Sequence, residues 1–187
     1  MRHTNTKTLY EYWNTRRLGR NAPGRADIAP KDVSGLLGHL FLLRRIDADH
    51  HIFRLAGSAL CQMHRREFKD QNFLSLWRGH DRLHMSALLE GALTAPAPAT
   101  AIVEAHSIDM RSVAVEISIL PLRGPEGIVD RVLGLYQPLS GGTLGHRPVV
   151  SHEIREIHPA SLPAQSVNVF APLAQARPRA RAANDAM

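Results

Sequence analysis

The chain has 187 residues, a length that suits one domain of about 110 to 150 residues with extensions. No run approaches the roughly 20 apolar residues of a membrane helix, and the N-terminus lacks the apolar stretch of a signal peptide, so we expect a cytoplasmic protein without membrane insertion. Cys61 is the single cysteine, which excludes an intramolecular disulfide and a cysteine-based metal site.

The net charge of +6 is unevenly distributed along the chain. Residues 1–30 contribute +4 and residues 145–187 contribute +2, whereas residues 31–144 carry twelve basic and twelve acidic side chains. Nucleic acid is therefore not an expected partner, and weak, salt-dependent binding through the basic termini remains a lesser alternative. Neither a phosphate-binding loop nor a Ser-His-Asp spacing is present, so we expect no enzyme activity.

The first predicted element is an amphipathic helix over residues 8–18. Thr8 and Glu11 fit a capping box, and Gly19 can end the helix. So short a helix needs a partner surface. We expect its apolar stripe to form a dimer or partner surface, or to cover an outer face of a sheet; the stripe consists of Leu9, Tyr12 and Trp13.

Two apolar-rich runs at 39–47 and 51–56 predict a first antiparallel pair of strands. Helical patterns follow, at 58–64, 72–77 and 79–93. Pro96 and Pro98 end the last of these helices.

A third strand is predicted over 101–109, followed by a β-hairpin. Apolar and polar residues alternate from 113 to 120, and an apolar run returns from 129 to 136 after a turn rich in glycine and proline. Because consecutive strands of this kind pair antiparallel, we expect an α+β fold in which a five-stranded antiparallel sheet carries helices on one face.

The ends of the chain are predicted to differ from this body. Residues 1–35 hold the N-terminal helix and a connector, and residues 36–140 form the domain. Prolines and arginines are scattered over residues 141–187, which we expect to be a largely disordered tail.

Several stretches of the sequence resemble a known family. The run V-E-I-S-I-x-P-L-R from Val115, the G-P-E-G turn and the return V-L-G-L look like the C-terminal hairpin of PAS sensor domains, and the resemblance covers about residues 36–138. More narrowly, three segments are similar to the small single-PAS regulatory proteins of alphaproteobacteria. These segments are Tyr12–Arg20, Pro23–Pro30 and Phe53–Leu60.

The resemblance implies a five-stranded sheet cupping helices around a small-molecule cavity, and a role in sensing or protein interaction. Since 187 residues leave no room for an attached output domain, the signal would pass by contact with a signalling protein such as a histidine kinase, or through a homodimer. A ligand-free dimerisation scaffold is the alternative. The predicted cavity residues, which are equally ordinary core positions, are Leu60, Cys61, Met85, Leu88, Val115 and Ile117.

Two histidines in the predicted helix at 79–93 stand at i and i+4, in the motif H-D-x-x-H formed by His80, Asp81 and His84. Zinc proteases of this pattern need Glu at the position of Asp81, and no third ligand is identifiable, so we expect no metal site here. Haem-binding PAS domains ligate iron through a histidine of the long helix, and His84 is the matching candidate.

Flavin photosensors of this fold carry their cysteine in the motif G-R-N-C-R-F-L-Q. Cys61 lies instead in S-A-L-C-Q-M-H, so flavin is not expected and Cys61 is interpreted as a core or cavity residue. Three polar residues interrupt otherwise apolar strands and are predicted to face solvent. They are Glu104, His106 and Glu116.

Overall fold

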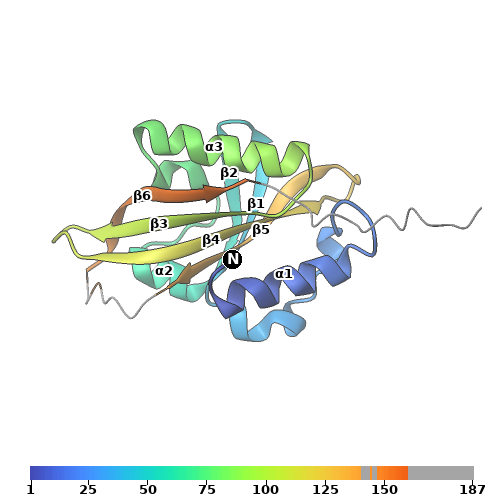
Figure 1. Ribbon diagram of the computed structural model, residues 1–187, viewed down its shortest axis with the longest axis horizontal. Coiled ribbons are helices and arrows are strands. Elements are labelled where there is room, and N and C mark those ends of the chain that lie inside the picture. Colours follow the sequence, from blue (N-terminus) through green and yellow to red (C-terminus); the bar gives the residue numbers. More distant parts are fainter. Residues whose placement is uncertain (140–143, 145–146, 160–187) are drawn as a thin grey trace, which may run out of the picture.

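The computed structural model describes residues 1–139, 144 and 147–159. In this part of the chain an antiparallel sheet separates two groups of helices, with α1 on one side and α3 on the other (Figure 1). The strand order is β2-β1-β5-β4-β3-β6. The strands are β1 Leu40–Asp47, β2 His50–Ala56, β3 Ala99–Ser107, β4 Ser112–Arg123, β5 Val129–Pro138 and β6 Val149–His158.

The helices are α1 Thr4–Arg16, α2 Ser58–His64 and α3 Gly79–Thr94, with short 3-10 helices at Arg25–Asp27, Pro30–Leu36 and Phe73–Leu76. The α+β class is thereby confirmed, as are the first five strands and the helices between β2 and β3. No helix among the described residues is long and apolar enough to cross a membrane.

A sixth strand distinguishes the sheet from the predicted five-stranded one. β6 pairs antiparallel with β3 and lies within residues 141–187, which were expected to be mostly disordered. Irregularities of register at Ile102/Val103 and His106/Ser107 break the alternation of β6, which explains why period-2 reasoning missed it. The rest of the predicted tail, residues 160–187, lies outside the described residues.

α1 begins four residues earlier than predicted. The ring nitrogen Nδ1 of His3 accepts the backbone N–H of Asn5 at 3.0 Å and caps the helix, so Thr8 lies inside α1 and the predicted capping box is wrong. Beyond Arg16 the chain leaves the helix through Leu18 and Gly19, both of which have positive φ.

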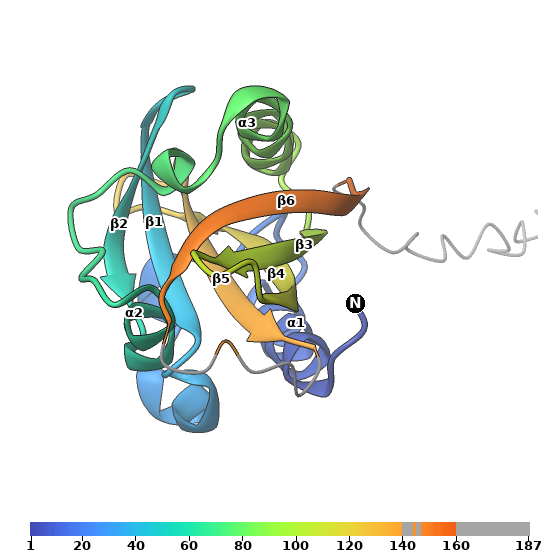
Figure 2. The same cartoon turned by 90° about the vertical axis from the view of Figure 1, so that its left-hand side faces the viewer.

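α1 packs against the face of the sheet opposite α3, so helices cover both faces rather than one (Figure 2). Leu9 and Trp13 are 0% exposed, and the Trp13 indole N–H donates to the Pro121 carbonyl at 2.8 Å. The Tyr12 hydroxyl accepts the Ala29 N–H at 3.0 Å. The prediction of a dimer surface at Leu9, Tyr12 and Trp13 is therefore wrong, because these side chains make intramolecular contacts; the alternative, a cover for the sheet, is confirmed.

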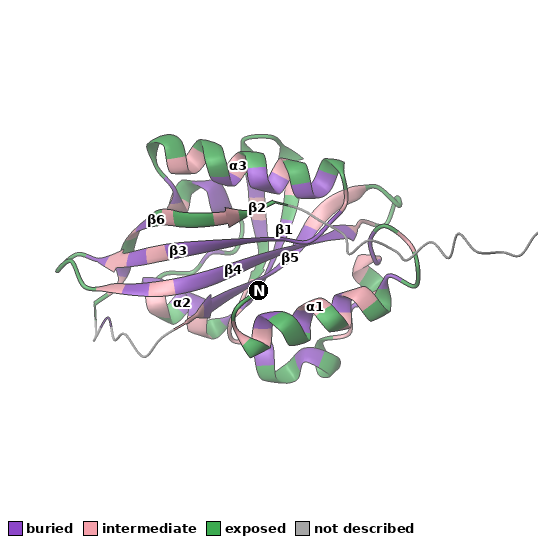
Figure 3. Cartoon of the chain, in the orientation of Figure 1, coloured by how far each residue is buried: buried purple, intermediate pink, exposed green. Residues whose placement is uncertain are grey.

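Figure 3 shows that much of β4 is buried. Glu116, which lies on this strand and was predicted to face solvent, is 0% exposed. Its carboxylate accepts the backbone N–H groups of Arg2 at 2.7 Å and His3 at 2.9 Å. Burial alone would raise the pKa of Glu116, but these two hydrogen bonds, the Thr6 hydroxyl and the N-terminal ammonium together outweigh it, and the pKa is lowered. Glu104 and His106 are half-buried near the other end of the same face.

Candidate functional site

The core between the sheet and α3, which we call the α3-side core, contains a group of polar and aromatic side chains where the end of α2 meets the start of β6. His64 is the last residue of α2, Tyr136 lies on β5, and His152 lies on β6. All three are buried, with 6%, 1% and 8% of their surface exposed. We call these three residues the histidine–tyrosine cluster. The surrounding core is otherwise apolar, so burying these groups carries a desolvation cost that must be offset.

The cluster is held by backbone carbonyls on its outer sides. His64 Nδ1 lies 2.9 Å from the Leu60 carbonyl oxygen, and His152 Nδ1 lies 3.4 Å from that of Leu76. On the inner side, His152 Nε2 lies 2.8 Å from the Tyr136 hydroxyl and 3.4 Å from His64 Nε2. The two Nε2 atoms therefore face each other, with the phenol oxygen beside them.

Aromatic contacts fix the orientation of the rings. His64 and His152 are stacked with ring centroids 5.3 Å apart, and Trp77 packs against His152 at 5.0 Å. Burial lowers the pKa of His64 to about 4 and that of His152 to about 3, so both imidazoles are neutral at pH 7. Burial also raises the pKa of the Tyr136 phenol, which keeps its proton.

Local structure places His64 at this point. Gly57 is the residue just before α2. A Cβ atom at this position would lie 2.2 Å from the Leu37 carbonyl oxygen, so only glycine allows the two segments to approach so closely. Arg65 follows α2 in the left-handed conformation with φ of 52° and ends the helix. α2 is thus limited to seven residues, with His64 at its inner end.

The cluster is reached from a pocket of about 310 Å³, which both histidines line. Arg66 and Arg78, both exposed, also line this pocket. The Arg66 guanidinium lies 4.7 Å from the centre of the Phe68 ring. A small ligand in the pocket would therefore meet two neutral imidazoles in its wall and two cationic groups at the surface.

The predicted cavity residues all lie in the α3-side core, where they are packed with one another and with the sheet. None of them lines the pocket at His64 and His152; Leu88 lines a separate surface groove of about 240 Å³ beside α3. They are Leu60, Cys61, Met85, Leu88, Val115 and Ile117.

His84, the predicted haem candidate, is exposed and lines the same open groove as Leu88. A haem ligand would need an enclosed apolar site on this side of α3, and the groove does not supply one. The residues present therefore do not fit haem.

Cys61 lies on α2 with its Sγ 3.7 Å from Glu67 Oε2. Burial, and then the Glu67 carboxylate, raise the pKa of the thiol, which disfavours a reactive thiolate.

Other polar groupings lie beside charged neighbours, although neither ring nitrogen of His51 has a hydrogen bond of normal geometry among the described residues. His51 is 0% exposed, with Nε2 3.0 Å from Glu90, which also receives two hydrogen bonds of 2.8 Å from Arg45 and ties α3 to β1. Glu104, His106 and Glu153 lie close enough to share a cation, but Arg155 already pairs with both carboxylates.

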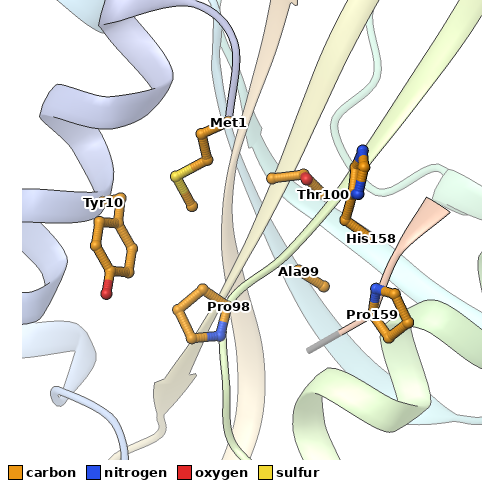
Figure 4. A pocket seen from close by; sticks show the side chains of 7 residues that line it. All are labelled: Met1, Tyr10, Pro98, Ala99, Thr100, His158 and Pro159. Carbon is orange, nitrogen blue, oxygen red and sulfur yellow. The ribbon is translucent and has the colours of Figure 1, made fainter. Parts of the chain in front are cut away.

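A larger pocket, of about 360 Å³, lies where α1 approaches the ends of β3 and β6 (Figure 4). Tyr10 stands on the α1 side, whereas His158 and Pro159 stand on the β6 side. The lining side chains are spread around an open space and bring no group of polar atoms together, so this pocket has the weaker claim as a functional site.

Comparison with known proteins agrees with the sequence resemblance. A family model described as PAS domain matches residues 1–137, and the chain therefore belongs to the PAS domain family. No curated protein matches the chain. Membership of the alphaproteobacterial single-PAS group remains a prediction.

Solved structures similar to the chain include light-oxygen-voltage (LOV) domains. One, from a study of a flavin analogue, is 15% identical with a TM-score of 0.47, over 59% of this chain and 84% of that one. An RNA-binding LOV receptor is 14% identical with a TM-score of 0.45, over 60% and 33%. The light state of the Aureochrome1 LOV domain is 12% identical with a TM-score of 0.43, over 59% and 88%. Likenesses this distant carry no argument about ligand or function.

Proposed function

We propose that this PAS domain is a sensory or regulatory module, a binding rather than a catalytic protein, that takes a small ligand at the histidine–tyrosine cluster. The observation that carries the proposal is the burial of two neutral histidines in the wall of a pocket. Apolar side chains of similar size would fill this position without a desolvation cost. Polar groups kept there at such a cost are typical of a binding site.

The position of the cluster supports transmission of a signal. Its three side chains come from α2, β5 and β6, so a ligand that draws them together changes how α2 packs against the sheet. Such a ligand shifts the equilibrium between two packings by no more than its difference in affinity for them.

Exposed apolar side chains near this site support output by protein contact. Val150, which lines the pocket, is 50% exposed, and Ile108 and Met110 in the β3–β4 turn are 71% and 80% exposed. Ser107, just before that turn, pairs with Val149. Apolar groups gathered in this way favour contact with another protein, for which a histidine kinase is the expected class by resemblance.

The experiment is complementation of a gene deletion in the source organism. We expect His152→Phe to fail to restore the transcript profile at normal protein abundance, because it removes the polar wall of the pocket. The double variant His80→Gln/His84→Gln, which changes two exposed histidines of α3, should restore it. Full complementation by His152→Phe would overturn the proposal.

The alternative functions have less support. A dimerisation scaffold loses its predicted surface, since Leu9 and Trp13 are buried within the chain. Nucleic-acid binding through the N-terminal arginines is weakened by their ion pairs, Arg16 with Asp32 and Arg20 with Asp27, each at 2.6 Å. The C-terminal arginines that were expected to contribute lie outside the described residues, apart from Arg147 and Arg155.

A further inference from the structure

The neutral side chains of the histidine–tyrosine cluster carry too few protons to satisfy all the hydrogen-bond acceptors around them. His64 uses its one ring proton at Nδ1, toward the Leu60 carbonyl, which leaves Nε2 as an acceptor. If His152 likewise donates from Nδ1 to Leu76 and accepts the Tyr136 hydroxyl at Nε2, two unprotonated nitrogens face each other at 3.4 Å. Among the described residues, His64 Nε2 then has no donor.

The other tautomer of His152 is worse. A proton on Nε2 would satisfy His64, but it would leave the bare Nδ1 of His152 facing the Leu76 carbonyl oxygen at 3.4 Å and displace the Tyr136 proton from its acceptor. Both assignments leave a buried polar group unsatisfied, which costs about 1 to 3 kcal/mol. Among the described residues, neither assignment therefore gives every polar group of the cluster a hydrogen-bond partner of the right kind.

We propose that His64 and His152, through Nε2, and Tyr136, through its phenol oxygen, bind a divalent first-row transition metal ion of the borderline-soft class to which Zn²⁺ belongs. This inference rests on the proposed function and names the class of ligand for its site. Imidazole nitrogens are common ligands of these ions.

The distance between the two nitrogens suits such an ion. With metal–nitrogen distances of about 2.0 to 2.1 Å, two tetrahedral nitrogen ligands lie about 3.3 to 3.4 Å apart, and the two Nε2 atoms lie 3.4 Å apart. The Nδ1 atoms of both rings face carbonyl oxygens, the arrangement that orients metal-binding histidines in proteins. The Tyr136 oxygen, 2.8 Å from His152 Nε2, must move slightly away from that nitrogen to bind the ion.

Charge balance follows from the same groups. The ion replaces the phenol proton of Tyr136, which leaves to solvent, so the site gains one positive charge rather than two. Because both histidines line the pocket, a water molecule or small anion from that side can fill the remaining coordination position. Arg66 and Arg78 on the same pocket favour an anion there.

A metal ion accounts for the cluster better than an added proton does. Burial opposes protonation of both histidines, and the nearby Arg66 guanidinium opposes it further. A metal ion meets the same cost of burial but forms coordinate bonds with three ligands at once and offsets its charge with the phenolate.

The test is titration of the full-length chain, free of any polyhistidine tag and first treated with a chelator, with Zn²⁺ by calorimetry and with Co²⁺ by visible absorption. We expect one site per chain with the intense Co²⁺ bands of four-coordination. His152→Phe and His64→Phe should each weaken that site by about a hundredfold or more. Tyr136→Phe, the most conservative change, should alter the Co²⁺ spectrum and abolish the release of one proton.

Matched controls address the other histidines of this chain. The double variant His80→Gln/His84→Gln removes the exposed pair on α3, and His106→Gln removes the member of the group with Glu104 and Glu153. Both should bind as the unaltered chain does. Binding that survives in correctly folded His152→Phe, as judged by circular dichroism, or that disappears in either control, would overturn the metal site.

The two proposals fail separately. If His152→Phe does not complement the deletion and yet no variant or unaltered chain binds Zn²⁺ or Co²⁺, the sensory role stands and the metal does not. If the metal binds as described and His152→Phe complements fully, the site exists but is not the input of the module.

Discussion

At the residue scale, burial gives some polar side chains roles that their sequence patterns do not predict. Glu116 alternates with apolar neighbours, a pattern that predicts a solvated strand face, but α1 covers that face, and Arg2 and His3 just before α1 supply two backbone N–H donors. His152 differs from Glu116, because its neighbours in the sequence give no indication of a site at all. It acquires its role because β6 brings it beside His64, 88 residues away in the chain.

Glu116→Gln tests the role of the buried carboxylate. We expect the free energy of unfolding to fall by about 1 to 3 kcal/mol at pH 7, because the amide carries no charge and has one oxygen where the carboxylate has two, so it can accept only one of the N–H groups of Arg2 and His3. Since the folded-state pKa of Glu116 lies below its ordinary 4.5, its stabilisation is present above pH 4.5 and is lost as the pH falls through the folded value.

Urea titrations of both proteins between pH 7 and pH 3 measure this difference. The gap between the unaltered chain and Glu116→Gln should narrow below pH 4.5. A gap that stays constant over this range would show that the carboxylate charge does not contribute.

At the element scale, α1 covers one face of the sheet and β6 extends its edge beside β3. The amphipathic stripe of α1 predicts a partner surface, but the stripe does not say whether the partner belongs to the same chain. β6 is less readable, because its bulged register hides the period-2 pattern and because its partner β3 lies more than 40 residues earlier. Among the strands, those that follow one another closely were predicted, and the one that pairs across a long connection was missed.

Trp13→Ala separates the two possible roles of α1. Because Trp13 is 0% exposed and packs on the sheet of its own chain, we expect a loss of about 3 to 5 kcal/mol in the free energy of unfolding, with no change in native molar mass by light scattering. Leu18→Ala, at a residue 79% exposed just beyond α1, is the matched control and should be close to neutral. A halved mass for Trp13→Ala with unchanged stability would restore the dimer surface.

At the scale of the whole molecule, the sheet lies between two hydrophobic cores. Trp13 belongs to the α1-side core and Trp77 to the α3-side core, and they are the only tryptophans in the chain. Both cores include alternate side chains of the same strands, so we expect the two cores to unfold together. The N-terminal residues therefore belong to the domain, as the family match over residues 1–137 also indicates.

Single-tryptophan variants measure this coupling. In Trp77→Phe the fluorescence reports the α1 side, and in Trp13→Phe it reports the α3 side. For each variant we expect the fluorescence transition in urea to coincide with its transition by far-ultraviolet circular dichroism, as a single cooperative unit requires. An earlier fluorescence transition in Trp77→Phe would show that α1 detaches from the sheet by itself.

The sequence by itself determined the α+β class, the first five strands, the central helices and the resemblance to PAS domains, because these depend on local periodicity and on turns between neighbouring segments. It also identified the apolar positions of α1, α3 and the hairpin, since burial follows the same periods. Only the tertiary structure decided which surface α1 covers, that a sixth strand closes the edge at β3, and that His64, Tyr136 and His152 meet. Contacts between residues that lie far apart in the chain leave no local pattern, and the candidate site is built from such contacts.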